Sequence, residues 1–268
     1  MNGTGKKQQS ARPKARSGTA AQPRPMKRRR RTVVGVAAVT ALAVAAGTGA
    51  LLAGHSGNSG GNSKNASGPL VVPANTTGDD RTVISYGKAD APHTLDIWLD
   101  PRCPYCAGVE TGLGATMREQ ADQGSYRIDY HFATFLDGAL GGKGSKRALS
   151  ALGAAAQESP AKFMDYLGVL YANHPAKESD DTFGSTSTLL ELADQVNGLR
   201  TPAFNKAVKE LSYLPWAEKV SDAFYKSGET STPVVKLDGH KLKVNSGVGI
   251  ASVTPSEFTA EVRTALGK

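Results

Sequence analysis

Apolar and polar residues alternate along several short segments of the chain, and this alternation predicts β-strands. The alternation is clear in residues 94–99 and 126–132, and residues 81–86, 233–237 and 240–244 are three further strand candidates. The last two flank Asp238-Gly239, a dipeptide typical of a two-residue hairpin turn. The pattern therefore predicts strands both before and after a long middle region.

Apolar residues at helical spacing occupy much of the remaining sequence, and capping residues mark where helices begin. The first helix should run from Cys103 to about Gln120. The later start signals are Ser159-Pro160, a Thr188–Glu191 capping box, Thr201-Pro202, Pro215 and a second capping box in Thr254-Pro255-Ser256-Glu257. The order of strands, helix, strand, helical block, hairpin and helix predicts an α/β domain with a helical insertion at about residues 140–228.

The positive charge of the chain is concentrated at its N-terminus. The 268 residues carry a formal net charge of +8, but residues 1–31 hold 11 Lys and Arg and no Asp or Glu. Residues 32–268 therefore carry a net charge of −3. This distribution excludes a basic nucleic-acid-binding domain, so no nucleic-acid partner is expected.

A stretch of 21 uncharged residues, 33–53, follows the basic cluster 27–31. About 20 apolar residues span the core of a bilayer, and basic residues before such a span stay on the cytoplasmic side. Residues 32–53 therefore predict either an uncleaved signal anchor or a secretory signal peptide cut near residues 43–46. The length favours the anchor, which would make this a single-pass protein of the cell membrane with its globular domain outside the cytoplasm. Cleavage would make the protein secreted.

Four regions follow from these patterns. Residues 1–31 form a basic cytoplasmic tail, and residues 32–53 form the anchor or signal peptide. Residues 54–79, rich in Gly, Ser and Asn and without periodicity, predict a flexible linker. Residues 80–268 form the globular domain.

The candidate chemistry lies in Cys103-Pro104-Tyr105-Cys106, which contains the two cysteines of the chain. Two intervening residues at a helix start bring the sulfurs about one turn apart. Cys103 would lie beside unpaired N–H groups and the positive end of the helix dipole, with Arg102 as a nearby cation, and these favour its thiolate. We therefore expect Cys103 to be an exposed nucleophile of low pKa and Cys106 to be a more buried resolving thiol.

The cysteine pair has three alternatives to a redox role: a structural disulfide, a zinc site and a Cu(I) site. A purely structural disulfide would close so short a loop that it gains little chain entropy. The spacings to His131, His174 and His240 match no familiar zinc pattern, so neither a metal nor another cofactor is expected. Cu(I) accepts two thiolates, so a copper-delivery protein remains the alternative from another class. The strand–CxxC–helix context favours redox function.

The motif and its context resemble the thioredoxin superfamily, and within it the DsbA-like disulfide oxidoreductases of bacterial envelopes. Asp100-Pro101 precedes the cysteine motif, and Ser231-Thr232-Pro233 resembles the cis-proline segment that comes before a hairpin and a final helix in this superfamily. Pro233 lies 127 positions after Cys106, and this distance accommodates the helical insertion of DsbA-like proteins. The resemblance covers about residues 80–268 and implies a thioredoxin-like fold.

The resemblance also implies roles for individual residues. Pro233 would follow a cis peptide bond and pack against the cysteines, and the Thr232 backbone would pair with a bound substrate strand. Many family members carry a buried acid six residues before the first cysteine, where this chain has Ile97. Asp100 is the closer candidate for assisting proton transfer at Cys106. An equal alternative is that Asp100 only interacts with the helix dipole, as an acid at the N-terminus of the helix.

These features together predict an extracytoplasmic thiol–disulfide oxidoreductase that introduces disulfides into exported, cysteine-containing proteins. The resemblance implies reoxidation by a quinone-linked membrane protein. A disulfide reductase or isomerase is the alternative within redox function. Envelope isomerases of this superfamily are usually dimers with an added domain, and residues 54–79 are too short and polar for one. We therefore expect a monomeric oxidase.

Overall fold

The computed structural model describes residues 1–3 and 68–267. The predicted anchor or signal segment at 32–53, almost all of the basic tail 1–31 and residues 54–67 of the predicted linker lie outside the described residues. In the described part of the chain, none of the helices combines the length and the apolar character that crossing a bilayer requires.

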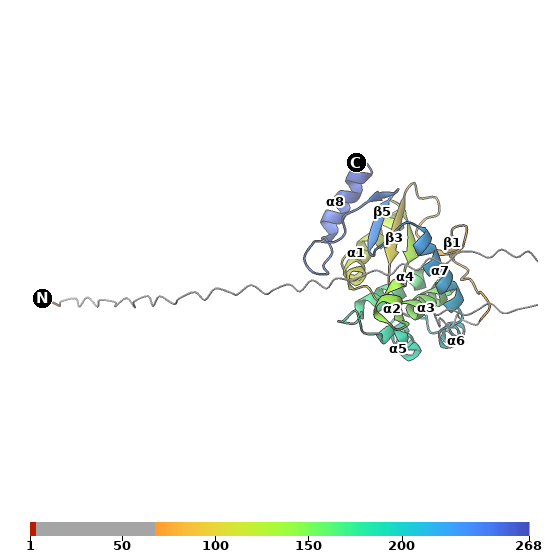
Figure 1. Cartoon of the computed structure of the whole chain (residues 1–268). Helices are drawn as coiled ribbons and strands as arrows, with labels where there is room; N and C mark the ends of the chain where they lie inside the picture. Colours follow the sequence, from red (N-terminus) through yellow and green to blue (C-terminus); the bar gives the residue numbers. More distant parts are fainter. Residues whose placement is uncertain (4–67, 268) are drawn as a thin grey trace, which may run out of the picture. The chain divides into compact units, whose positions relative to one another are not determined.

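Residues 68–267 form the α/β domain that the sequence predicts (Figure 1). The strands are β1 (Thr76–Thr77), β2 (Val83–Tyr86), β3 (Thr94–Leu99), β4 (Arg127–Phe132), β5 (Val234–Leu237) and β6 (His240–Lys241). The helices are α1 (Pro104–Gln123), α2 (Phe135–Leu140), α3 (Gly144–Glu158), α4 (Pro160–Ala172), the 3₁₀ turn η1 (Thr182–Gly184), α5 (Thr186–Ala193), α6 (Pro202–Glu210), α7 (Leu214–Lys226) and α8 (Pro255–Ala265).

The strands form one mixed sheet in the order β1-β2-β4-β3-β5-β6. β3 and β4 are parallel, with Leu99 opposite Phe132, and the other pairs are antiparallel. A parallel pair needs a crossover connection, and α1 supplies it. The C-terminal end of the central strand β3 therefore leads directly into the helix that carries the cysteines.

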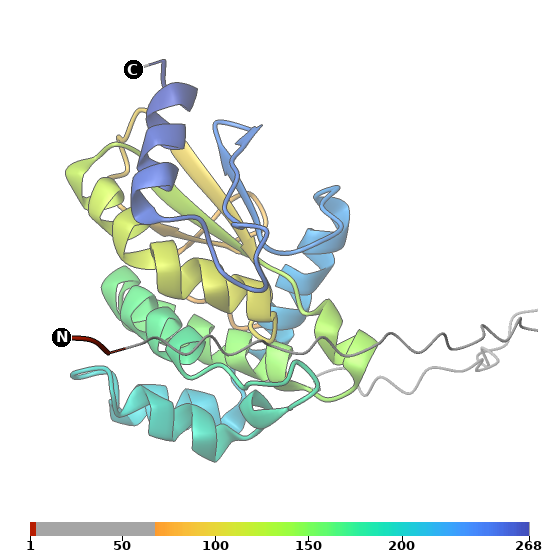
Figure 2. The same ribbon diagram turned by 90° about the vertical axis from the view of Figure 1, so that its left-hand side faces the viewer.

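The alternation of β3 places three of its apolar side chains on one buried face. Leu95, Ile97 and Leu99 are fully buried, whereas Asp96 on the opposite face pairs with His131. Figure 2 shows α1 and α8 side by side on one face of the sheet, while the green and teal helices of the insertion gather at one end of the domain. The sheet face and these helices share one hydrophobic core.

Two predicted boundaries need correction. α5 begins at Thr186 because the Ser185 hydroxyl accepts the Thr188 N–H at 3.3 Å, so the predicted Thr188–Glu191 capping box is wrong. The predicted strand 240–244 is shorter in the structure, where β6 ends at Lys241. The chain beyond it turns into a loop in which Asn245 pairs with Ser252.

Helix α3 carries no start signal that the sequence pattern could reveal. Its N-cap residue, Lys143, makes no side-chain capping bond. Instead the Asp181 carboxylate accepts the N–H groups of Lys143 and Gly144 at 2.7–3.2 Å. The Asp137 carboxylate accepts the next two N–H groups, those of Ser145 and Lys146, at 2.9–3.0 Å. Both capping carboxylates lie outside the residues that immediately precede the helix, so the insertion was predicted here without this helix.

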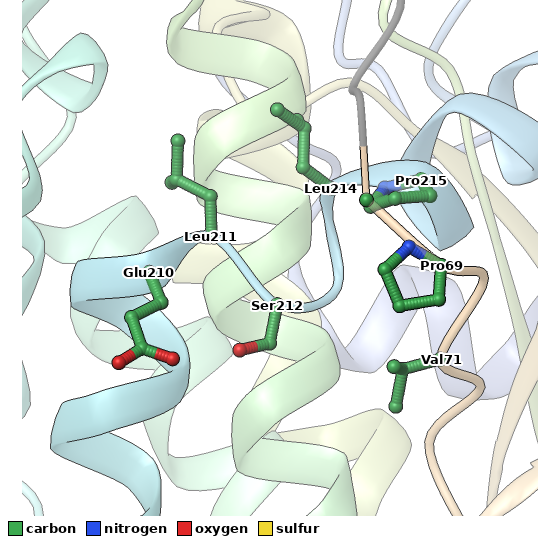
Figure 3. Close-up of a pocket in the computed structure, with 8 residues that line it drawn as sticks. Pro69, Val71, Glu210, Leu211, Ser212, Leu214 and Pro215 are labelled. Atoms are coloured by element: carbon green, nitrogen blue, oxygen red, sulfur yellow. The ribbon is translucent and has the colours of Figure 1, made fainter.

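Part of the predicted linker packs against the domain. Pro73 and Thr76 are buried, β1 pairs with β2, and the Asn75 side chain donates to the Ala156 carbonyl at 2.8 Å. The domain therefore begins before residue 80. Figure 3 shows Pro69 and Val71 facing the turn between α6 and α7, where they line a pocket of about 430 Å³.

Two helical glycines provide a matched test of how tightly the N-terminal segment and α7 pack on α3. A Cβ at Gly153 would lie 2.9 Å from the Trp216 ring and 3.3 Å from Pro73, whereas a Cβ at Gly168 in α4 would meet nothing within 4 Å. Gly153→Ala should destabilise the protein by about 1–3 kcal/mol through overpacking. Gly168→Ala should stabilise it by about 0.5–1 kcal/mol, because alanine is the better helix former.

Urea unfolding of the two variants beside the wild type measures both effects. A Gly153→Ala variant as stable as the wild type would show that the Trp216 contact is not tightly packed.

Candidate active site

The cysteine motif lies at the junction of β3 and α1. Cys103 is the N-cap residue of α1, with extended backbone, and its N–H donates to the Asp100 carbonyl at 2.9 Å. Pro104 occupies the first helical position, where the absent N–H leaves nothing unsatisfied. Cys106 then falls in the first turn of the helix, on its buried side.

Both cysteines are free thiols, and both are largely buried. Cys103 is 5% exposed and Cys106 is fully buried. The expectation that Cys103 would be exposed is therefore wrong in degree, although it is the more accessible of the two. The neighbouring Tyr105 is 46% exposed and forms part of the surface beside Cys103.

The pKa values of the two thiols are shifted in opposite directions. The hydrogen bond with Cys106 lowers the pKa of the Cys103 thiol, and the N–H groups of Cys106 and Tyr105 add to this effect against the opposing influence of burial. Burial, followed by the interaction with Cys103, raises the pKa of Cys106 well above its ordinary value. The arrangement thus favours the thiolate at Cys103 over a thiolate at Cys106.

Arg102 does not direct its charge at Cys103, and this corrects the sequence interpretation. Its side chain is buried and donates to Asp137 Oδ1 at 3.1 Å, the Gly141 carbonyl at 2.7 Å and the Glu178 carbonyl at 3.2 Å. Since Asp137 neutralises the guanidinium, Arg102 fixes the turn before the cysteines to the helical insertion.

Asp100 is a second anchor of the same turn. Its buried carboxylate accepts the Arg102 N–H at 3.0 Å, the Leu136 N–H at 3.2 Å and the Ser145 hydroxyl at 2.6 Å. Burial nevertheless raises the pKa of Asp100 to about 6. Its carboxylate is thus fully engaged by the turn, α2 and α3.

The segment before β5 lies against the nucleophile. The Thr232–Pro233 peptide bond is cis, as the resemblance implies. Cys103 Sγ lies 3.7 Å from the Thr232 carbonyl oxygen, so the pairing of β5 with β3 brings together residues 129 apart in the chain. Ser231, Thr232 and Pro233 line a pocket of about 310 Å³ together with residues 241–245.

A loop that the sequence analysis did not single out covers the outer face of α1. A Cβ at Gly108 would lie 1.8 Å from the Ile250 carbonyl oxygen, and a Cβ at Gly112 would lie 2.1 Å from Ser252 Oγ. Tyr105, Gly108 and Gly112 share one helix face, so the loop lies beside Tyr105. Val248 and Ile250 in this loop are 76% and 50% exposed. The two glycines, four residues apart, were the available sequence signal for this close approach.

Glu110 is the other residue that the sequence analysis missed. It lies one turn beyond Cys106 in α1, and its side chain is buried in the core. Burial raises the pKa of its carboxyl group to about 7. A charged residue type on the otherwise apolar buried face of α1 was the signal that could have revealed it.

The family model described as Thioredoxin matches residues 79–259 of this chain. Among curated proteins, Disulfide bond formation protein D of Bacillus subtilis (strain 168) is 23% identical over 158 residues, which cover 59% of this chain and 68% of that protein.

Solved structures share the fold. BdbD of Bacillus subtilis superposes with a TM-score of 0.57 at 20% identity, covering 75% of this chain and 100% of that one. DsbA of Mycobacterium tuberculosis gives 0.54 at 22% identity, covering 74% and 91%. The family model spans more than half of the sequence and includes both cysteines and Pro233. The chain therefore belongs to the thioredoxin family, and its domain has the fold of the DsbA-like thiol–disulfide oxidoreductases.

Proposed function

We propose that this protein is a protein-disulfide oxidoreductase that acts as an oxidase outside the cytoplasm and introduces disulfides into exported proteins. The unequal acidity of the two thiols carries this proposal. A stabilised Cys103 thiolate makes the dithiol the favoured state of the pair, and a protein with a favoured dithiol is a strong oxidant.

The reaction begins with a disulfide between Cys103 and Cys106. A substrate thiolate attacks Cys103 Sγ, the bond to Cys106 breaks, and the Cys106 sulfur takes up a proton because burial strongly disfavours its thiolate. A second substrate thiolate then attacks the substrate sulfur of the mixed disulfide. Cys103 leaves as the stabilised thiolate, so the substrate gains a disulfide and the enzyme is left as the dithiol.

The surface around Cys103 fits an extended polypeptide. The Thr232 backbone lies beside the sulfur, where it can pair with a substrate strand. Tyr105, Val248 and Ile250 expose apolar side chains near the start of α1, where they can receive apolar residues of an unfolded substrate. Roles in substrate binding for Tyr105, Thr232 and Pro233, and in active-site support for Asp100 and Pro104, are parts of this proposal.

The location and the partner rest on further observations. The basic cluster 27–31 before the uncharged residues 33–53 supports an N-terminus inside and a domain outside the cytoplasm. The name of the Bacillus subtilis relative describes a role in disulfide bond formation. The family resemblance implies that a quinone-linked membrane protein reoxidises the pair, with the enzyme acting as a monomer.

The reduction potential of the Cys103/Cys106 pair tests the direction of the reaction. Equilibration of the purified protein with glutathione should give a value less negative than about −200 mV, in the range of oxidising members of the superfamily. A value near that of thioredoxin, about −270 mV, would indicate a reductase instead. Stoichiometric copper after purification, without any thiol-oxidising activity, would indicate copper delivery.

The same energetics predict that the reduced protein resists urea better than the oxidised protein. The lowered pKa of Cys103 stabilises the folded dithiol above the ordinary thiol pKa of about 8.5, and this stabilisation is lost as the pH falls through the folded value. The advantage of the reduced form should therefore shrink between about pH 8.5 and acidic pH. An oxidised form that is the more stable one across this range would contradict the oxidase assignment.

Substitution of each thiol separates their roles. Cys106→Ala should accumulate mixed disulfides through Cys103, whereas Cys103→Ala should accumulate none. Because the Cys106 hydrogen bond is the largest cause of the low Cys103 pKa, the Cys103 thiolate should titrate at higher pH in Cys106→Ala. Cys106→Ser, which keeps a hydrogen-bond donor, is the matched control and should shift the titration less. Thiolate absorbance and a non-reducing gel give both readouts, and trapping through Cys106 would reverse the assigned roles.

The topology can be tested in intact cells. A membrane-impermeant thiol reagent should label Cys103 after mild reduction, because the domain that carries it is placed outside the cytoplasm. Cys103→Ser is the control, since Cys106 is fully buried and should not react. Labelling that requires lysis of the cells would place the domain inside.

A further inference from the structure

A cavity of about 310 Å³ opens beside the cis-proline segment, and the exchange of disulfides by the two cysteines does not itself use it. One wall of the cavity is formed by Ser231, Thr232 and Pro233. The carbonyl oxygen of Thr232 lies 3.7 Å from Cys103 Sγ, so this wall connects the cavity to the reactive sulfur. A substrate residue close to the attacking cysteine would therefore reach the cavity.

The cavity exists because the pairing of β5 with β6 ends early. The last hydrogen bond of this pairing runs from the Leu242 N–H to the Val235 carbonyl at 2.9 Å. The next N–H, that of Lys243, donates instead to the Glu261 carboxylate of α8 at 2.7 Å. The chain after β6 thus turns away from β5 before it reaches Pro233, and it leaves a hollow at the edge of the sheet next to the reactive sulfur.

The residues that line this cavity carry two positive charges and no negative charge. The charged ones are Lys241 and Lys243, and no Asp or Glu is among them. Lys241 is exposed and forms no ion pair with any of residues 68–267. Its cross-strand neighbour Lys236 does have partners, because its ammonium group binds the Glu229 carboxylate and lies 5.2 Å from the centre of the Trp98 ring. Lys241 therefore presents an uncompensated positive charge at the cavity.

The charge of Lys243 is partly offset by acids of α8. Its N–H is bound by Glu261, and its own charge adds to the lowering of the Glu257 pKa, after the larger effect of two hydrogen bonds from Thr254. Asn245 contributes a neutral polar group to the same lining. Its Oδ1 is buried without a hydrogen-bond partner among the described residues, so it can accept an N–H of a bound peptide.

We propose that this cavity is a subsite for an acidic side chain of the polypeptide substrate, within two residues of the cysteine that reacts with Cys103. An extended chain rises about 3.3 Å per residue, so such a side chain lies within reach of a cavity that begins at Thr232. The ammonium group of Lys241 would donate to the substrate carboxylate in a charge-assisted hydrogen bond. The inference rests on the proposed thiol–disulfide exchange at Cys103 but not on its direction.

The subsite adjoins the apolar surface beside Cys103. Residues 241–245 continue directly into the loop 246–252, which exposes Val248 and Ile250. A preferred substrate segment therefore places an acidic residue and an apolar residue close together around its cysteine.

The net charge of the chain after the basic tail works against a preference for acidic substrates. Residues 32–268 carry a net charge of −3, so long-range electrostatic steering favours cationic substrates. A preference for acidic peptides requires a local positive group that outweighs this steering. The sign of the charge effect on the rate thus separates the subsite from the charge of the whole chain.

Three peptides test the subsite. They are identical except at the four positions within two residues of a single cysteine, which are all Glu, all Gln or all Lys. Stopped-flow measurement of their attack on the oxidised protein is expressed per peptide thiolate. The Glu peptide should react about fivefold faster than the Gln peptide, as one partly exposed ion pair allows, and the Lys peptide should react more slowly than both. Salt at about 0.5 M should reduce this preference, because it screens exposed charges.

Variants of the lysines assign the preference to the cavity. Lys241→Gln should remove most of it, Lys241→Arg should keep it, and Lys241→Glu should make the Lys peptide the fastest of the three. Lys243→Gln should reduce the preference less, because Glu257 and Glu261 already offset its charge. Lys206→Gln, at an exposed position of α6 in the insertion, is the matched control and should keep the wild-type preference.

Equal rates with the Glu and Lys peptides, or a faster Lys peptide, in the wild type would overturn the inference. A Lys241→Gln variant that slows all three peptides by the same factor would also overturn it, because the lysine would then act on Cys103 and not on the substrate. The ratio of the rates does not depend on the reduction potential. A potential near that of thioredoxin, together with a preference that requires Lys241, would overturn the oxidase proposal and support the subsite. An oxidising potential without any preference would do the reverse.

Discussion

The buried polar contacts of Asp100 and Arg102 determine where the nucleophilic cysteine lies. Asp100 holds the turn to α2 and α3, and Arg102 holds it to Asp137 and to two carbonyl groups of the insertion. Removing one partner from a buried ion pair typically costs about 3–5 kcal/mol, because the other charge is left unpaired. The turn before Cys103 is therefore held from both sides. The helical insertion is part of the active-site scaffold, since its first helices supply the groups that bind this turn.

The sequence predicted those parts of the fold that depend on local patterns. The alternation in β3, the capping box at Thr254 and the cysteine motif are each contained within a few residues, and the structure agrees with them. The start of α3 was not predictable in this way, because its first N–H groups are capped by Asp137 in α2 and by Asp181, 37 residues from Gly144. Arg102 illustrates the same limit. Its neighbours in sequence suggest a cation beside a thiolate, but residues 35 and more positions away determine where its side chain points.

The residues of the candidate site were predicted from the sequence, but the segments that cover them were not. Cys103 and Cys106 were found from spacing alone, and the cis-proline segment from resemblance. The exposure of Cys103 depends on Thr232, which arrives with β5 after the whole insertion. The apolar surface beside it depends on a loop near the C-terminus that approaches α1 closely because Gly108 and Gly112 have no side chains. Such long-range contacts leave no periodic pattern in the sequence, and here the glycines at positions 108 and 112 are the only indication of them.

Asp100 and Glu110 show how hydrogen bonding changes what a buried carboxyl group contributes to the fold. Burial raises the pKa of both, to about 6 for Asp100 and about 7 for Glu110. Asp100 accepts three hydrogen bonds that favour its charged form and hold the turn in place. Glu110 has an oxygen without such a bond among the described residues, so nothing offsets its desolvation. Because its folded pKa lies above the unfolded value of about 4.3, its contribution to stability is lost as the pH rises from there to about 7, by roughly 3 kcal/mol. A neutral residue of similar shape would avoid this loss. Glu110 is therefore retained at a buried position where its charge opposes folding near neutral pH.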